Sequence, residues 1–264
     1  MLRWLKALPL ALALAALIVF ATFAASCGST NSQARFVNAI SDDTISLDIE
    51  FNGTKAFGGV GPFTASGSTY VSIPTGSDKI QGFASGTTTT SFGPLTSPIS
   101  FNSGSQYTVV ATGFLAGTVN IVAPVDTNTA PAVGTVNFRV IDASPSGVGS
   151  VDVYIIQNTA QNTPSCTPSS TCLPTISGVS SPLSSTTPYS AYKNMSFNSL
   201  GFGYTLYVTQ AGSPNTLPGW SGGYQLSQIG SVSVGSIRTI VLVDNPPGNN
   251  GMSEAGTIVL SDLN

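Results

Sequence analysis

The residues of this chain that could act as acids or ligands are few, and two aspartates are the most regular of them. Asp48 and Asp152 each lie in an alternating run of apolar and polar residues. Each follows an arginine at the same spacing, Arg35 in one case and Arg139 in the other. A carboxylate there could bind a ligand or transfer a proton. Because each aspartate stands between inward-facing apolar residues, we interpret both as solvent-facing groups of a strand.

Other catalytic arrangements have less support. The chain contains no histidine, which rules out Ser-His-Asp chemistry. Glu50 or Glu254 could belong to a facing carboxylate pair, as glycoside hydrolysis requires. The adjacent Asp42 and Asp43 could offer oxygens to Ca²⁺, but their spacing matches no calcium loop, and a role in a turn is the better interpretation. We therefore assign no catalytic residue, metal or cofactor, and a secreted carbohydrate-active or other hydrolytic enzyme remains the alternative.

The three cysteines divide into one and a pair. Cys166 and Cys172 are separated by a short segment with turn-forming residues, so the chain can double back to the separation that a disulfide needs. We expect this disulfide to pin a local loop. Zinc is the weaker alternative, because there is no histidine and no second cysteine pair.

The beginning of the chain has the features of an export signal. Arg3 and Lys6 precede an apolar run from residue 7 to 25, which ends in small residues. The run is nearly long enough to span a bilayer, so an uncleaved signal anchor is the alternative. The sequence Phe23-Ala-Ala-Ser-Cys27 resembles a bacterial lipobox, which implies removal of residues 1–26 and acylation of Cys27.

The residue after Cys27 bears on the destination of the protein. Gly28 in this place resembles lipoproteins sorted to the outer membrane, so we expect a bacterial cell-envelope lipoprotein that contacts the membrane through its N-terminal lipid. Residues 27–33 lack apolar side chains and are expected to form a short tether. Acyl chains anchor a protein stably when two or more are present.

The composition excludes one large class of partners. Charged residues make up only 7% of the chain and the formal net charge is −3. The polar surface must therefore consist mainly of hydroxyl and amide groups. Such a surface gives no positive field to attract a phosphate backbone, so we expect no nucleic-acid partner.

The chain contains an internal duplication. Residues 35–51 and residues 139–155 share one pattern, in which an apolar run leads through a polar turn into an alternating run. Short β-rich segments separated by Gly, Pro, Ser and Thr follow each copy, and no convincing helical period appears after the signal. The sequence predicts an all-β fold of two tandem immunoglobulin-like β-sandwich domains.

We place the domains by these patterns. The first sandwich is expected at residues 34–125, the linker at 126–134 and the second sandwich at 135–264. Residues 158–187 form a Ser-, Thr- and Pro-rich insertion in the second copy, and a segment of this length is usually functional or poorly ordered.

One aromatic segment is a candidate for binding. Trp220 and Tyr224 lie among glycines and could form an exposed stacking platform for a sugar or a peptide. The alternative is that they cover the edge of their own core. A glycan or a protein is therefore the expected class of ligand.

Two short motifs carry a resemblance to a known family. The turn Asp142-Ala-Ser-Pro145 and the following Val151-Asp-Val-Tyr154 resemble the signature of the bacterial domain of unknown function 4397. The family's histidine position corresponds to Asn38 in the first copy and to Asp142 in the second. The resemblance implies secreted or surface-attached β-domains in repeats and supplies no catalytic residue. We thus expect a non-catalytic envelope protein that serves adhesion, ligand binding or envelope structure.

Overall fold

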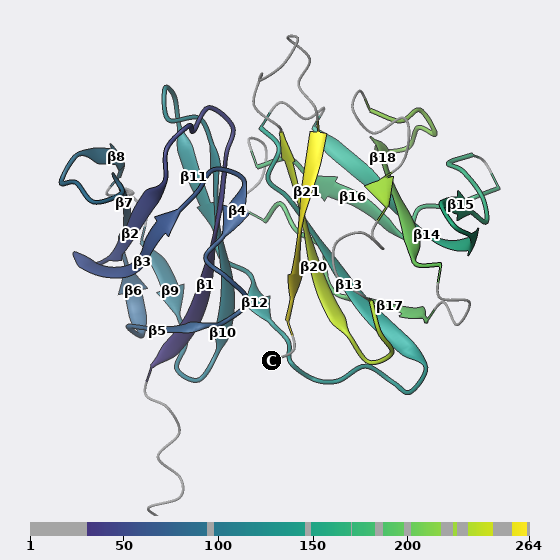
Figure 1. The fold of residues 1–264 in the computed structure, drawn as a ribbon, viewed down its shortest axis with the longest axis horizontal. Coiled ribbons are helices and arrows are strands. Elements are labelled where there is room, and N and C mark those ends of the chain that lie inside the picture. The colour runs from purple at the N-terminus through teal and green to yellow at the C-terminus, as the bar shows by residue number, and fades with distance from the viewer. Residues whose placement is uncertain are drawn as a thin grey trace, which may run out of the picture.

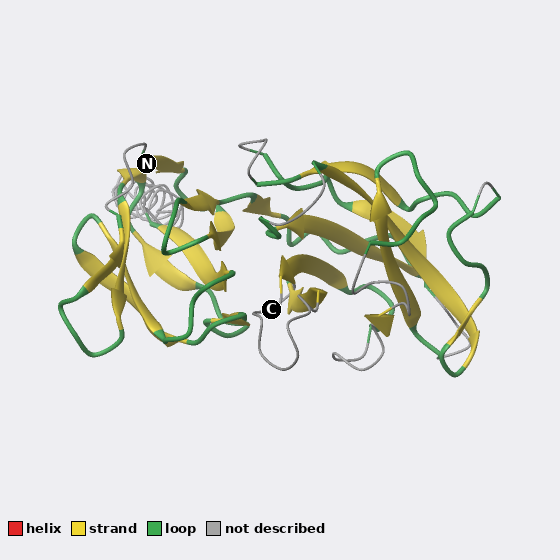
Figure 2. Ribbon diagram, turned by 90° about the horizontal axis from the view of Figure 1, so that it is seen from above, coloured by secondary structure: helices red, strands yellow, loops and turns green. Residues whose placement is uncertain are grey.

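The computed structural model describes residues 31–93, 98–145, 149–169, 171–182, 187–197, 202–217, 224–225, 232–244 and 255–262. These ranges contain strands and connecting loops and no helix, so the all-β prediction is confirmed for them (Figure 2). The same ranges accordingly hold no helix that could cross a bilayer. The signal segment, Cys27, Trp220 and Glu254 lie outside the described residues, and of Tyr224 only the backbone is described.

The N-terminal half, residues 31–126, contains two main sheets and a small two-stranded one. The inner sheet has the order β11-β10-β1-β4, with β12 paired to β10 and β5 to β1, and the outer sheet has the order β3-β2-β7-β8; β6 pairs with β9. The strands are β1 (Ser32–Ile40), β2 (Leu47–Phe51), β3 (Thr54–Val60), β4 (Thr64–Ala65), β5 (Val71–Ile73), β6 (Gly76–Asp78), β7 (Ile80–Ala84), β8 (Thr90–Phe92), β9 (Ile99–Phe101), β10 (Gln106–Gly113), β11 (Val119–Val122) and β12 (Val125–Asp126).

The C-terminal half, residues 135–262, has a similar plan. Its inner sheet has the order β17-β13-β20-β21, and its outer sheet has the order β15-β14-β18-β19, with β16 paired to β14. The strands are β13 (Thr135–Asp142), β14 (Ser150–Ala160), β15 (Thr163–Pro164), β16 (Ile176–Ser180), β17 (Lys193–Ser196), β18 (Tyr204–Gln210), β19 (Tyr224–Gln225), β20 (Ile237–Asp244) and β21 (Ala255–Ser261).

Each half has a core between its inner and outer sheets. In the N-terminal half, Phe36 of β1 and Ile49 of β2 belong to one buried apolar cluster. In the C-terminal half, Phe138 of β13 and Leu206 of β18 belong to another. These residues come from alternating runs, so each strand directs every second side chain into the core of its own half.

The two inner sheets also pack against each other, so that the halves lie side by side (Figure 1). Val37 of β1 and Val110 of β10 share a buried apolar cluster with Ile141 of β13 and Val241 of β20. These residues belong to the strand faces that point away from the cores of the two halves. Both faces of each inner sheet are therefore buried, and the molecule is layered as outer, inner, inner and outer sheet.

The central strands run in one direction. β1 pairs with β10 in parallel, from Gln33 opposite Gln106 to Ile40 opposite Gly113. β13 pairs with β20 in the same parallel manner. Near the ends of β10 and β13 the halves are again in contact, since Thr112 donates a hydrogen bond to the carbonyl of Ala143. All four strands thus begin at one end of the molecule and finish at the other.

Asn52-Gly53 forms a hairpin turn, as this dipeptide after a β-rich run predicts. Asn52 has φ of 49° and Gly53 has φ of 78°, the positive pair that a type I′ turn needs. The turn joins β2 to β3. The Asn52 side chain also accepts a hydrogen bond from the backbone amide of Lys79 at 2.8 Å, which fixes the turn to the beginning of β7.

Candidate functional site

A group of buried polar side chains lies between the two inner sheets, and Arg35 is one of its two central arginines. Arg35 is fully buried, on the face of β1 that looks toward the C-terminal half. Its Nε donates to Thr108 Oγ1 at 2.9 Å, within its own half. Its Nη1 donates to the carbonyl of Ser261 at 2.5 Å, and its Nη2 forms an ion pair with Asp262. The guanidinium of the N-terminal half is thus neutralised by a carboxylate of the C-terminal half.

Arg139 makes the reciprocal set of contacts. Its Nε donates to Thr239 Oγ1 at 3.2 Å, within its own half. Its Nη1 donates to the carbonyl of Val125 at 2.9 Å, and its Nη2 forms an ion pair with Asp126. The arginine of each half therefore forms an ion pair with an aspartate of the other half, and the two ion pairs are equivalent.

Two tyrosines complete this cluster, each beside one arginine. Tyr70 Oη donates to Asp126 at 2.6 Å, and Tyr192 Oη donates to Asp262 at 2.7 Å. Each ring also lies against a guanidinium, with Arg35 Cζ 5.2 Å from the Tyr70 centroid and Arg139 Cζ 4.7 Å from the Tyr192 centroid. Desolvation raises the pKa of both phenols well above the usual value, so both remain protonated donors.

The surroundings of Arg139 favour its charged form. Burial is the largest single effect and would by itself lower the pKa of Arg139, but Asp126, Tyr192 and Asp262 together outweigh burial, so the pKa is raised. Arg35 also lies 3.7 Å from Asp126, which links the two ion pairs. The cluster holds two positive and two negative side chains in contact, so its charges balance. Its groups bond to one another, and this arrangement suits a junction between the halves rather than chemistry on a substrate.

The repeated aspartates Asp48 and Asp152 are not solvent-facing, and that expectation was wrong. Each side chain belongs to a residue that is only 6% exposed. Asp152 accepts backbone N–H bonds from Gly178 and Gly212, both at 2.8 Å. A strand face that points away from the core need not face water, because turns of the same half fold over it.

Asp48 has the same kind of surroundings in the N-terminal half. It accepts backbone N–H bonds from Gly59 at 2.8 Å and from Gly86 at 3.1 Å. Lys55 adds an ion pair, and Ser85 donates its hydroxyl at 2.8 Å. The Lys55 ammonium, together with these donors, holds the pKa of Asp48 well below the usual aspartate value. Asp48 and Asp152 therefore act as acceptors that tie two glycine turns to a central strand of the outer sheet.

Asn38 and Asp142 occupy matching places in β1 and β13 but differ in charge. Both are buried. The Asn38 amide donates to Asp43 at 2.6 Å. Asp142 accepts a bond from the Ser144 amide at 3.0 Å through one oxygen, while its Oδ2 has no hydrogen-bond partner among the described residues. Burial, with a smaller effect of Asp244, raises the pKa of Asp142 to about 7.

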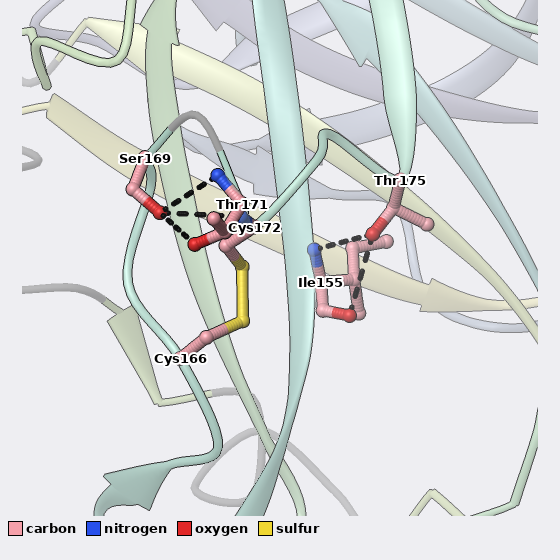
Figure 3. The surroundings of a disulfide bond; sticks show 6 residues. All are labelled: Ile155, Cys166, Ser169, Thr171, Cys172 and Thr175. Carbon is pink, nitrogen blue, oxygen red and sulfur yellow. Dashed lines mark hydrogen bonds between the residues drawn. A yellow bond between two sulfur atoms is a disulfide. The ribbon is translucent and has the colours of Figure 1, made fainter.

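The expected disulfide between Cys166 and Cys172 is present (Figure 3). Its loop is closed further by Ser169, whose Oγ accepts the backbone N–H of Cys172 at 3.1 Å. Cys172 packs with Tyr154 and Tyr207 on the face of the outer sheet that points away from the core. The disulfide loop thus covers an apolar patch.

The rest of the insertion contains a strand that the sequence comparison missed. Val179 of β16 lies opposite Val151 of β14, as Val60 of β3 lies opposite Leu47 of β2. β3 and β16 each also place a glycine of positive φ against the repeated aspartate of their half, Gly59 against Asp48 and Gly178 against Asp152. The end of the insertion therefore corresponds to β3, and the extra residues lie between β14 and β16.

The remaining acidic candidates from the sequence that the structure describes have different partners and do not form one site. Asp42 accepts the backbone amides of Leu115 and Ala116, and Asp43 accepts that of Ile45, so the predicted turn role is confirmed. Glu50 lies opposite Lys55 across β2 and β3. Among the described residues no group of three or more acidic or cysteine side chains could hold a metal. The binding candidate Trp220 and the side chain of Tyr224 lie outside the described part of the chain.

One open depression of about 390 Å³ lies at the beginning of β1 and β10. Hydroxyl and amide groups dominate its lining, including Gln33, Ser105, Gln106 and Asn128. Its only charged lining residue is Asp126, which is already paired with Arg139. The depression offers hydrogen bonds without an acid or a base for catalysis.

Sequence reasoning noted both arginines but missed their partners. Val122 lies opposite Val110 and Ile258 lies opposite Val241, which makes these two pairs equivalent. Extending both strands from there aligns Asp126 with Asp262. The sequence signal that could have revealed Asp126 and Asp262 is the presence of an aspartate at the end of each copy. Both are buried in the structure.

The comparison with protein families gives a match to the domain of unknown function DUF4397 at residues 32–154. This range includes every strand of the N-terminal half, then β13 and the first part of β14. It contains both arginines and both repeated aspartates. The resemblance inferred from the sequence is confirmed for this part of the chain. The search of curated proteins found no match.

Proposed function

We propose that this protein is a non-catalytic lipoprotein of the bacterial cell envelope, anchored by acyl chains on Cys27, most consistently in the outer membrane. In this proposal residues 34–125 and 135–264 form two immunoglobulin-like β-sandwich domains that arose by duplication. They serve adhesion, ligand binding or the structure of the envelope. The lipobox-like sequence before Cys27 supports the anchor.

A single observation carries the non-catalytic assignment, namely that the recurring polar residues bond to the protein itself. Asp48 and Asp152 both accept two glycine amides. The two arginines are both paired with aspartates across the inner sheets. Residues that catalyse a reaction need a surface open to substrate, whereas these groups are enclosed and their bonding capacity is used.

The duplication is supported by the equivalence of contacts rather than by overall similarity. Each half has a parallel pair of central strands, a buried arginine and a terminal aspartate that the other half receives. Two unrelated sandwiches would have no reason to repeat this set of side chains in the same order along the chain.

The anchor is tested by mass spectrometry of the protein from the membrane fraction of a bacterial host. We expect an N-terminal Cys27 that carries acyl chains. The Cys27→Ala variant, which cannot be acylated, should leave the membrane fraction. Recovery of the protein with Met1 intact, or with an unmodified Cys27 in the soluble fraction, would contradict the proposal.

Ligand binding is tested at the aromatic segment. If Trp220 forms a stacking platform, binding on a glycan array should be lost in Trp220→Ala and partly kept in Trp220→Phe, since the phenyl ring retains a stacking face. Equal binding by all three proteins would place recognition elsewhere, and an array with no signal would favour a protein ligand.

A further inference from the structure

The end of the molecule at which the central strands begin is formed by three uncharged turns. Three tight turns lie there, at residues 102–105, 132–135 and 233–236, immediately before β10, β13 and β20 (Figure 1). The strands that follow these turns are neighbours, since β13 pairs with β20 and β10 shares a buried apolar cluster with both. Gly235 donates its amide to the carbonyl of Thr135, so two of the turns are in direct contact.

This end carries exposed apolar side chains and no charge in its turns. Val133 is fully exposed and Val234 is 50% exposed, each at the tip of its turn. None of the three turns contains a charged residue. The nearby aspartates Asp126 and Asp262 are buried and neutralised by the two arginines. Among the described residues, the three turns at this end of an acidic protein therefore present no carboxylate that would repel an anionic surface.

The N-terminal segment enters the fold at the same end. The carbonyl of Asn31 accepts the amide of Gly104, and the amide of Gln33 donates to the carbonyl of Ser105. The chain is therefore fixed to the turn at 102–105 from Asn31 onward. Only three residues separate Asn31 from Cys27, so the Cα atoms of these two residues can be at most about 14 Å apart.

We propose that this end of the molecule rests on the membrane that holds Cys27, with Val133 and Val234 in the headgroup region. The inference depends on the acylation of Cys27 proposed above. A lipid anchor this close to the fold brings the three turns to the bilayer, and their lack of charge removes electrostatic repulsion from anionic headgroups. Exposed valines lose contact with water there, which favours one orientation of the molecule. The partner is a lipid surface, and the opposite end of the sheets faces away from it.

The test uses the acylated protein, from which residues 1–26 and therefore Trp4 have been removed, in vesicles of phosphatidylethanolamine and phosphatidylglycerol that contain brominated lipid. In a Trp220→Phe background, Val133→Trp provides a fluorescent reporter at the proposed contact. Ile45→Trp is the matched control, because Ile45 is 43% exposed in the loop after β1, at the other end. Both positions are on the surface, and circular dichroism should confirm that both variants fold.

We expect brominated lipid to quench most of the emission of Val133→Trp and little of that of Ile45→Trp. Similar quenching of both variants, or of neither, in protein that floats with the vesicles and carries acylated Cys27, would overturn the orientation and leave the anchor intact. Absence of acylation would overturn the anchor and this inference together. Hydrogen exchange of the protein without substitutions provides a second measurement. The amides of the turn at 132–135 should exchange more slowly in vesicles, and this protection should disappear when detergent removes the bilayer.

Discussion

Arg35 and Arg139 are enclosed by protein on all sides, and an enclosed guanidinium is tolerated only when its charge and its donors are satisfied. Each finds a hydroxyl in its own half and a carboxylate in the other. In the N-terminal half alone, Arg35 would lose its closer partner Asp262 and keep only Asp126, at 3.7 Å. At the scale of single residues, the repeated polar groups explain why the halves remain together.

Removing one arginine should be costly. We expect Arg35→Met to lower the free energy of unfolding by about 3 to 5 kcal/mol, because Asp262 would remain buried without its partner. Urea unfolding followed by circular dichroism measures this loss. Lys55→Met is the control, since the Lys55 side chain is 53% exposed and its ion pair with Asp48 should contribute less. A similar loss for both variants would contradict the special role of the buried pair.

Asp142 should make stability depend on pH. Its folded pKa of about 7 lies above the ordinary value of 3.8, so the folded state holds a proton that the unfolded state has released between these values. Stability should therefore fall as the pH rises from about 4 to 7. Asp142→Asn, which copies the amide found at Asn38, should stabilise the protein above pH 7 by up to about 4 kcal/mol and have little effect near pH 4.

Thermal unfolding of Asp142→Asn and the unsubstituted protein at a series of pH values measures this difference. A difference that is constant from pH 4 to pH 8 would mean that the carboxylate of Asp142 does not titrate in this range in the folded protein. Asn38→Asp is the converse change, and it should destabilise the protein at neutral pH.

At the scale of elements, the sequence predicted what depends on local patterns. Alternation around Asp48 indicated a strand, which is β2 at Leu47–Phe51, and the dipeptide Asn52-Gly53 is typical of the turn that follows it. Alternation also separated the two faces of β13, but it could not tell whether the second face met water or another sheet. That ambiguity explains why Arg139 was identified and its surroundings were not.

The contacts between distant strands had no local signal. The parallel pairing of β1 with β10 joins residues more than seventy positions apart, and the ladder hydrogen bonds involve backbone atoms that every residue has. The N-terminal half uses two strands, β11 and β12, where the C-terminal half uses β21 alone. This break hid the equivalence of Asp126 and Asp262 from a comparison of sequences.

The disulfide loop belongs to this scale, because it covers one face of the outer sheet. Changing Cys166 and Cys172 together to serine should lower stability by roughly 2 kcal/mol or less, since the loop is short. The larger effect should be local, with faster proteolysis of the loop and more exposure of Tyr207. Limited proteolysis with mass mapping measures it, and unchanged cleavage in this loop would show that packing alone holds it.

At the scale of the whole molecule, the two halves share one buried layer of apolar side chains in addition to the Arg-Asp cluster. We therefore expect a single cooperative transition in scanning calorimetry rather than one for each half. Val110→Ala, in the shared layer, should lower the temperature of that one transition by several degrees. Two separate transitions, with only one of them moved, would mean that the halves unfold independently.

The exchange of aspartates also sets the order in which the molecule can be completed. Arg35 is synthesised early, and its carboxylate partner Asp262 follows 227 residues later. Until then Arg35 lacks its closest carboxylate and has only Asp126 of its own half, at 3.7 Å. A chain interrupted before Asp262 would also leave the apolar inner-sheet face of the early half incompletely covered, and proteases and chaperones can recognise such a face.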